Sequence, residues 1–240
     1  MAQLFAGTSG WAYPSWKPDF YPQKLAQKKF LAHYTTMLNT VEVNFTFRQL
    51  VKETTIQNWL AESPAHFRFG VKAHQVITHI KRLKGTGDFV SRFLATIEPL
   101  AAAGKLGPVL FQLPPNLKAD SALLKDFLAT LPRTVPAAFE FRHESWFSDA
   151  TWDLLKSANS ALCVAETETR TTPDVVTGSF AYYRFRKPTY TGEERRAMVD
   201  RIQQHIAEER NVFAYFKHEE TPEGALYAVE LLRHVSGAAS

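Results

Sequence analysis

The sequence predicts an α/β fold in which eight parallel strands alternate with helices and close into a single (β/α)8 barrel of the TIM type. Eight short apolar segments are separated by helical patterns, and this order repeats along the whole chain. The length of 240 residues is close to the ~250 residues typical of such barrels. A doubly wound open sheet is the competing fold, but no Gly-x-Gly-x-x-Gly segment or Walker lysine follows the first strand. We therefore expect one domain over residues 1–240.

The individual elements follow from periodicity and from turn-forming residues. Strands are predicted at residues 4–8, 40–45, 67–72, 108–115, 138–146, 161–165, 180–186 and 212–217. Helices are predicted at residues 24–38, 53–62, 88–103, 121–131, 149–158, 193–210 and 224–235, with Asp88 as an N-cap. The segment 167–178 is rich in Thr, Pro and Gly and is too short for a crossover helix with its loops. The helical layer is therefore expected to thin after the sixth strand.

Composition narrows the class of protein. The net charge of +4 and the pI near 9.1 permit phosphate or nucleic-acid partners without requiring them. The one cysteine, Cys163, lies in an apolar run and is expected to be a buried small hydrophobe. No apolar run approaches the ~20 residues of a membrane span, and the N-terminus does not resemble a signal peptide. We expect a cytoplasmic protein with no membrane partner; the sequence leaves its oligomeric state open.

The fifth predicted strand carries an unusual charged face. In the segment Ala138–Trp146, Phe139 and Phe141 alternate with Glu140 and Arg142. The phenylalanines are expected to pack beneath helices, which directs the charged pair into the barrel. Buried charges cost free energy unless they are paired, so this pair needs partners or a ligand.

Other strands end in the same way, with a polar side chain directed inward. Because the carboxyl ends of barrel strands and the following loops build the active face, these side chains are expected to converge on one pocket. The inward positions are Glu42, Asn44, Lys72, Gln112, Glu140, Arg142, Arg184, Arg186 and Lys217. Trp11 and Trp146 lie in the adjoining loops, where they either pack on the rim or form a stacking wall for a sugar or a base.

Several cations at one mouth favour an anionic ligand, since arginine binds phosphate and carboxylate in a bidentate manner. The predicted catalytic residues are Glu42 and Glu140, which would orient the cations or move a proton. A glycosidase-like acid/base pair is an alternative, although neighbouring arginines would lower both carboxyl pKa values and disfavour a general acid. The predicted substrate-binding residues are Trp11, Asn44, Lys72, Gln112, Arg142, Trp146, Arg184 and Lys217.

A metal site is a further alternative. His79, His143, His218 and Glu220 could join the two inner carboxylates as ligands. None of these residues has the tight spacing of a His-Glu-x-x-His motif, and the cations would compete with a metal. We therefore assign no metal and leave the cofactor unknown.

The chain resembles the domain of unknown function 72 (YecE-like) family. The resemblance lies in segments spread over nearly the whole chain: 7–11 with Tyr13 and Trp16, 40–44, 69–72 with 77–79, 107–115, 139–146, 183–184 and 215–216. It implies a TIM-barrel-like fold with a polar cavity at the strand ends, and it brings no assigned reaction. Phe45 and Arg48 stand in the segment where the family commonly has Ser and Tyr. After the seventh-strand Arg184 the family often has His-Gly, whereas here Phe185 leads to Arg186, Lys187 and Pro188. These differences add positive charge.

Three functions remain open from the sequence. The first is an enzyme acting on a small anionic substrate, either phosphorylated or sugar-acid-like. The second is a non-catalytic protein that binds nucleic acid or an anion. The third is a divalent-metal phosphoesterase that resembles the xylose-isomerase-like barrels, which contain apurinic endonucleases.

Overall fold

The computed structural model describes residues 1–167, 171–217 and 220–237 and has eight parallel strands in one sheet. The strands are β1 (Leu4–Thr8), β2 (Thr40–Val43), β3 (Arg68–Lys72), β4 (Leu106–Gln112), β5 (Ala137–Glu140), β6 (Ala161–Glu166), β7 (Phe180–Phe185) and β8 (Asn211–Phe216). They pair in the order β1-β8-β7-β6-β5-β4-β3-β2, and a parallel bridge between Ser9 and Glu42 joins the two outer strands. The predicted TIM-barrel-like fold is confirmed.

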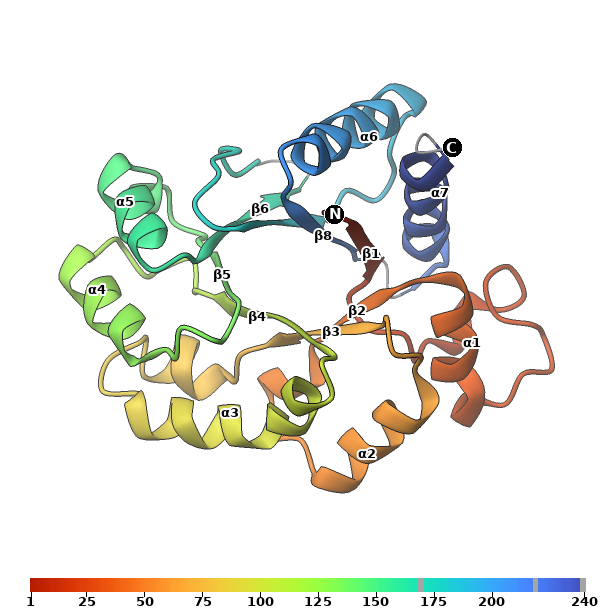
Figure 1. Ribbon diagram of the computed structural model, residues 1–240, viewed down its shortest axis with the longest axis horizontal. Helices are drawn as coiled ribbons and strands as arrows, with labels where there is room; N and C mark the ends of the chain where they lie inside the picture. The colour runs from red at the N-terminus through yellow and green to blue at the C-terminus, as the bar shows by residue number, and fades with distance from the viewer. Residues whose placement is uncertain (168–170, 218–219, 238–240) are drawn as a thin grey trace.

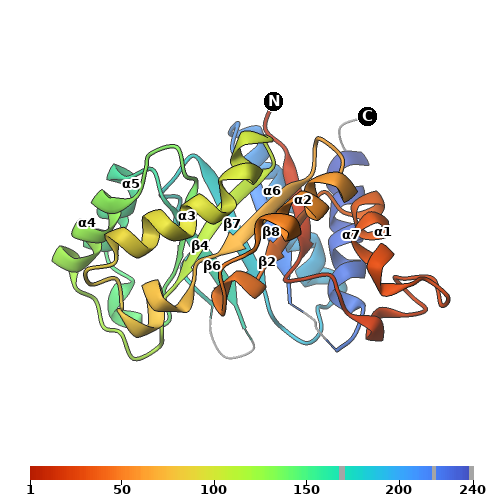
Figure 2. The same cartoon turned by 90° about the horizontal axis from the view of Figure 1, so that it is seen from below.

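Helices surround this barrel (Figures 1 and 2). They are α1 (Phe30–Met37), α2 (Glu53–Glu62), α3 (Gly87–Ala102), α4 (Ser121–Thr130), α5 (Asp149–Ser157), α6 (Gly192–Ala207) and α7 (Glu223–Gly237). Between β6 and β7, the described residues 167 and 171–179 form no helix. The predicted thinning of the helical layer after the sixth strand is therefore confirmed for this part of the chain.

Several boundaries differ from the prediction. The fifth strand ends at Glu140 rather than Trp146, so Arg142 lies beyond the strand, and residues Glu144–Trp146 form a short 3-10 helix. The fourth strand ends at Gln112 rather than Pro115. The first helix begins at Phe30 rather than Lys24, because residues 26–29 are exposed and Lys28 and Lys29 disfavour the positive end of a helix. Asp88 is not an N-cap but lies in the first turn of α3. The second strand ends at Val43, so Phe45 does not face the helices and is 46% exposed.

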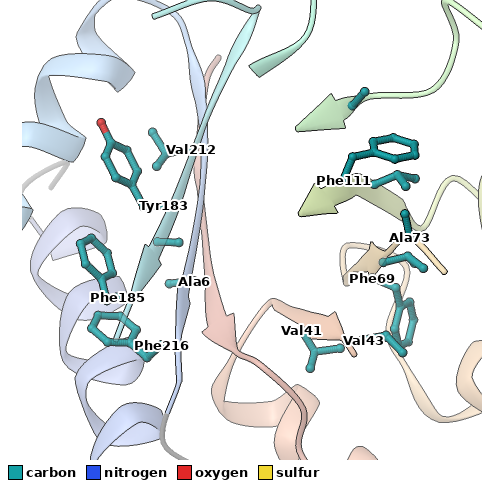
Figure 3. Close-up of a cluster of buried hydrophobic side chains, with 14 of the residues drawn as sticks. Ala6, Val41, Val43, Phe69, Ala73, Phe111, Tyr183, Phe185, Val212 and Phe216 are labelled. Carbon is teal, nitrogen blue, oxygen red and sulfur yellow. The ribbon is translucent and has the colours of Figure 1, made fainter. Parts of the chain in front are cut away.

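The chain has two apolar cores. The smaller one fills the barrel and includes Phe5, Leu110, Phe180, Tyr182 and Tyr215. The larger one lies between strands and helices, and Figure 3 shows some of its side chains on strands of opposite sides of the barrel. Each strand alternates between these two surroundings, which is why its polar inward positions are forced together at the carboxyl end.

The seam between β1 and β2 is closed mainly by side chains. Asn39 Nδ2 donates to Leu4 O at 2.8 Å, and Asn39 Oδ1 accepts from Ala6 N at 2.9 Å. Tyr34 Oη donates to Thr40 O at 3.0 Å. A Cβ at Gly7 would lie 1.9 Å from Thr40 O, so only glycine permits the two backbones to approach this closely.

Candidate functional site

The floor of the site is a buried arginine between two buried carboxylates. Arg184 on β7 donates from Nη2 to Glu42 Oε1 at 2.7 Å and from Nη1 to Glu140 Oε2 at 2.5 Å. The three side chains are at most 2% exposed. We call Glu42, Arg184 and Glu140 the floor triad. The predicted residues Glu42 and Glu140 thus both contact the predicted Arg184.

Further polar groups complete the coordination of both carboxylates. Glu42 accepts from Tyr182 Oη at 2.6 Å and from Ser9 Oγ at 2.8 Å. Glu140 accepts from Gln112 Nε2 at 2.9 Å. Gln112 was predicted at this pocket, whereas Tyr182 was not, although the alternation along β7 that directs Arg184 inward also directs Tyr182 inward.

Both floor carboxyl groups are ionised near neutral pH. Burial opposes ionisation of Glu42, but Arg184, Tyr182 and Ser9 outweigh burial and lower its pKa. For Glu140, burial is outweighed by Arg184 and the neighbouring arginines, and the pKa lies well below its ordinary value. A general acid must hold a proton at working pH, so neither carboxyl group has the protonation state that this role needs.

The two carboxylates also lack the arrangement of a glycosidase pair. In that chemistry, the carboxyl groups lie on either side of the bond that is cleaved. Here the guanidinium group of Arg184 occupies the space between Glu42 and Glu140 and binds both. The triad is therefore suited to holding a positive charge in a fixed position.

Three further cations lie above the floor triad. Arg142 Nε donates to Glu140 Oε1 at 3.0 Å, and Arg186 Nη1 lies 3.9 Å from the same oxygen. Lys72 Nζ donates to Gln112 Oε1 at 2.9 Å. The side chains of Arg142 and Arg186 are 28% and 16% exposed, and Lys72 is half-buried. We call Lys72, Arg142 and Arg186 the upper cations.

The site carries more positive than negative charge. The floor triad and the upper cations together have four cations and two carboxylates, which leaves two positive charges. Burial, followed by the charge of Arg184, lowers the pKa of Lys72 to about 8, although Glu42 and Glu140 act in the opposite direction. Burial, followed by repulsion from Arg184, also lowers the pKa of Arg186. A bound anion would relieve this repulsion.

A cavity of about 680 Å³ opens beside Arg186, one of the upper cations, over the ends of β7 and β8. Its charged lining residues are Arg186, Lys217, Glu220 and Glu223, and Thr189 and Thr221 lie among them. Lys217 is exposed and lies at the outer edge of the mouth. The structure thus brings Lys217 to the same face as the upper cations.

The two predicted tryptophans have different positions. Trp146 is fully buried, stacks on Phe141 with ring centroids 4.7 Å apart, and donates from Nε1 to Leu117 O at 2.8 Å. The expectation that Trp146 stacks on a ligand is therefore wrong; its apolar ring packs below the rim. Trp11 is half-buried at the end of β1, with its ring edge-on to Trp59.

Asn44 lies in the turn after β2 rather than at an inward strand position. It precedes the short helix η3 (Phe45–Phe47) without capping it by its side chain. Its Oδ1 is buried and has no hydrogen-bond partner among the described residues. The predicted inward strand position of Asn44 is corrected, because the strand ends at Val43.

The candidate metal ligands do not form a cluster in the part of the chain that the structure describes. Within it, no three His, Cys, Asp or Glu side chains lie together as metal ligands would. His143 accepts a hydrogen bond from Ser145 N at 3.2 Å, and His79 lies against Phe47. His218, another candidate from the sequence, is outside the described residues.

Among the described helices, none is long and apolar enough to cross a membrane.

Comparison with known proteins places this barrel among proteins of one family. The model of the family described as protein of unknown function DUF72 matches residues 5–239. The UPF0759 protein YunF of Bacillus subtilis is 29% identical over 151 residues, which cover 60% of this chain. The match covers 52% of YunF, so it spans about half the length of this curated relative.

Two crystal structures of DUF72 family proteins are similar to this chain in fold. The protein from Thermotoga maritima has a TM-score of 0.85 at 23% identity, with 98% of this chain and 99% of that chain covered. One from Enterococcus faecalis has a TM-score of 0.77 at 17% identity, with 99% and 98% covered. At these identities the similarity shows the shared fold.

Proposed function

This chain belongs to the DUF72 family, and we propose that its barrel mouth binds a small anionic molecule that carries a phosphate or carboxylate group. The observation that carries this proposal is the surplus of two positive charges over the floor triad and the upper cations. Charges of one sign that are held together at a cost in free energy indicate a ligand of the opposite sign.

The upper cations are the groups that would contact the ligand. Arg184 has both terminal nitrogens engaged by carboxylates and lies beneath the surface. Arg142 and Arg186 remain partly exposed above it, and Lys72 is half-buried at the end of β3. Arginine fixes the orientation of a phosphate or carboxylate by paired hydrogen bonds, while lysine contributes a point charge.

The floor triad limits the chemistry available to an enzyme at this site. Because its carboxyl groups are ionised and paired, their contribution would be to hold Arg184 and Arg142 in place rather than to transfer protons. Cations fixed in advance can stabilise negative charge that develops in a transition state. The proposed substrate is therefore one whose reacting group is, or becomes, negatively charged.

Calorimetric titration of the purified protein with inorganic phosphate and with gluconate tests the proposal. We expect both Arg142→Gln and Arg186→Gln to weaken binding of at least one probe by about tenfold to a hundredfold, since a hydrogen bond to a charged group contributes ~1.5–3 kcal/mol. Arg133→Gln is a matched control because this exposed arginine precedes β5 at the opposite end of the barrel.

Three results would count against this function. Neither probe binds the wild-type protein, or the mouth variants bind as tightly as the wild type, or Arg133→Gln weakens binding equally. A single-stranded oligonucleotide is included as a third probe. If it binds while the small anions do not, and its affinity falls steeply with salt, the mouth is a nucleic-acid backbone site.

A further inference from the structure

A second cavity, of about 300 Å³, opens beside the mouth where β1 and β2 end. Its walls are mostly apolar and aromatic: Trp11, Tyr13, Val43, Phe45 and Trp59. This volume is at the lower limit of small-molecule pockets. It therefore suits one ring-sized group rather than an entire substrate. We call it the aromatic pocket.

The walls of the aromatic pocket are held in place by their own contacts. Trp59 stacks on Phe69 with ring centroids 5.6 Å apart, and Trp11 packs edge-on against Trp59. Tyr13 Oη donates to Ser9 O at 2.9 Å. Gly10 has a φ of 91°, and a side chain there would collide with Tyr13. A pocket fixed in this way loses little entropy when it is filled.

Asn44 gives the aromatic pocket one polar requirement. Asn44 is one of the residues that line the cavity, and its Oδ1 is buried without a partner among the described residues. A residue that precedes a helical turn ordinarily uses this oxygen to accept from the backbone of the turn, but Asn44 makes no such bond to η3. A buried acceptor without a donor costs free energy, and a donor on a bound ring would satisfy it.

The aromatic pocket and the floor triad are neighbours along two strands. Ser9 binds Glu42 in the floor, and Trp11 lies two residues further along the chain. Asn44 likewise lies two residues beyond Glu42, which corresponds to ~7 Å of extended chain. Gly10 N donates to Glu42 O at 2.9 Å and ties the two segments together. The aromatic pocket and the floor triad therefore share the carboxyl ends of β1 and β2.

We propose that the aromatic pocket binds an apolar ring with one hydrogen-bond donor, and that Asn44 Oδ1 accepts the hydrogen bond from this donor. The ring belongs to the same ligand whose anionic group lies at the upper cations. The ligand is an aromatic or heteroaromatic ring that has one hydrogen-bond donor and that carries a carboxylate group or a phosphate ester. This inference rests on the proposed function for the anionic end alone; the ring site has its own observations in the aromatic walls and Asn44.

Matched ring probes test the inference by calorimetry. Indole has an apolar ring and one N–H donor, while 1-methylindole has the same ring without the donor. We expect indole to bind the wild-type protein at least threefold more tightly, which is within the range for one hydrogen bond. Asn44→Leu should abolish this difference, and Asn58→Leu, at an exposed position of α2, should preserve it.

A structural role for Asn44 makes a different prediction. If its side chain served only the fold, Asn44→Leu would lower the unfolding midpoint in urea. We expect the midpoint to be unchanged or higher, because the substitution removes a buried acceptor that has no partner. Equal affinities of the wild-type protein for indole and 1-methylindole would overturn the ring site.

Indole acids with one to three methylene groups before the carboxylate test whether one ligand spans both sites. At least one should bind more tightly than indole, and Arg186→Gln should remove the gain. If the indole preference is present but no acid gains affinity, the joint ligand is overturned while the ring site stands. If phosphate and gluconate also fail to bind, the failure lies in the proposed anion site.

Discussion

Replacing Arg184 by Met should strongly destabilise the protein. The substitution keeps an unbranched apolar stem but leaves two carboxylates, each at most 2% exposed, without their shared cation. Glu140 keeps Arg142 and Gln112, whereas Glu42 keeps only the neutral donors Tyr182 and Ser9 among its described hydrogen-bond partners. Removing one partner of a buried ion pair costs ~3–5 kcal/mol, and we expect Arg184→Met to lose that much at pH 7.

The pH dependence identifies the cause of this loss. In the wild type, the pKa of Glu42 is lowered from 4.5, so its contribution to stability is present above pH 4.5 and lost as pH falls through the lower folded value. Without Arg184, burial dominates and raises the pKa of Glu42. The penalty is then largest at neutral pH and is relieved as pH falls, so the gap between the two proteins should narrow from pH 7 to pH 4.5.

Urea unfolding at several pH values measures these quantities. The double variant Glu42→Gln with Arg184→Met should be more stable at pH 7 than Arg184→Met alone, because it removes the uncompensated charge. Arg133→Met, at an exposed site, should stay within ~0.5 kcal/mol of the wild type. A loss below ~1 kcal/mol in Arg184→Met, or a gap that does not change with pH, would refute the ion-pair account.

Two further predictions follow from the site and from the seam of the barrel. Because the pKa of Lys72 is about 8, Lys72 should lose its charge as pH rises from 7 to 9, and the affinity for sulfate should fall. In titrations of Lys72→Met, the affinity for sulfate should not change over this pH range. The same pH dependence in both proteins would contradict this role. Asn39→Ala removes the bonds to Leu4 O and Ala6 N and should cost ~2–6 kcal/mol, since each of these two backbone groups, when left unpaired, costs ~1–3 kcal/mol. It should also speed hydrogen exchange at Ala6, and unchanged exchange there would show that the seam does not depend on Asn39.

Much of the barrel could be predicted because its signals are local. Alternation over four to seven residues identifies a strand and assigns its two faces, and this placed Glu42, Glu140 and Arg184 on the inward face. Boundaries were less certain where the local signal continued past the true end of an element. Phe45 continues the alternation of β2, yet the backbone turns after Val43 and leaves Phe45 exposed.

The candidate site was predicted as a set of residues but not as a network. The sequence indicated that cations and carboxylates converge, and it left open whether Glu42 and Glu140 form an acid/base pair. The structure places Arg184 between them, which depends on contacts between residues 142 positions apart in the chain. Likewise, Trp146 follows a strand as a ligand-stacking residue would, but its ring turns inward onto Phe141.

The sequence by itself determined the alternation of strands and helices, the inward face of each strand and the excess of positive side chains at the strand ends. These properties depend on residue spacing and on side-chain chemistry within single segments. Only the tertiary structure decided which charges neutralise each other, which aromatic rings are buried and which acceptor stays without a donor. Those outcomes depend on distances between strands that are far apart in the chain, and closing the barrel sets these distances.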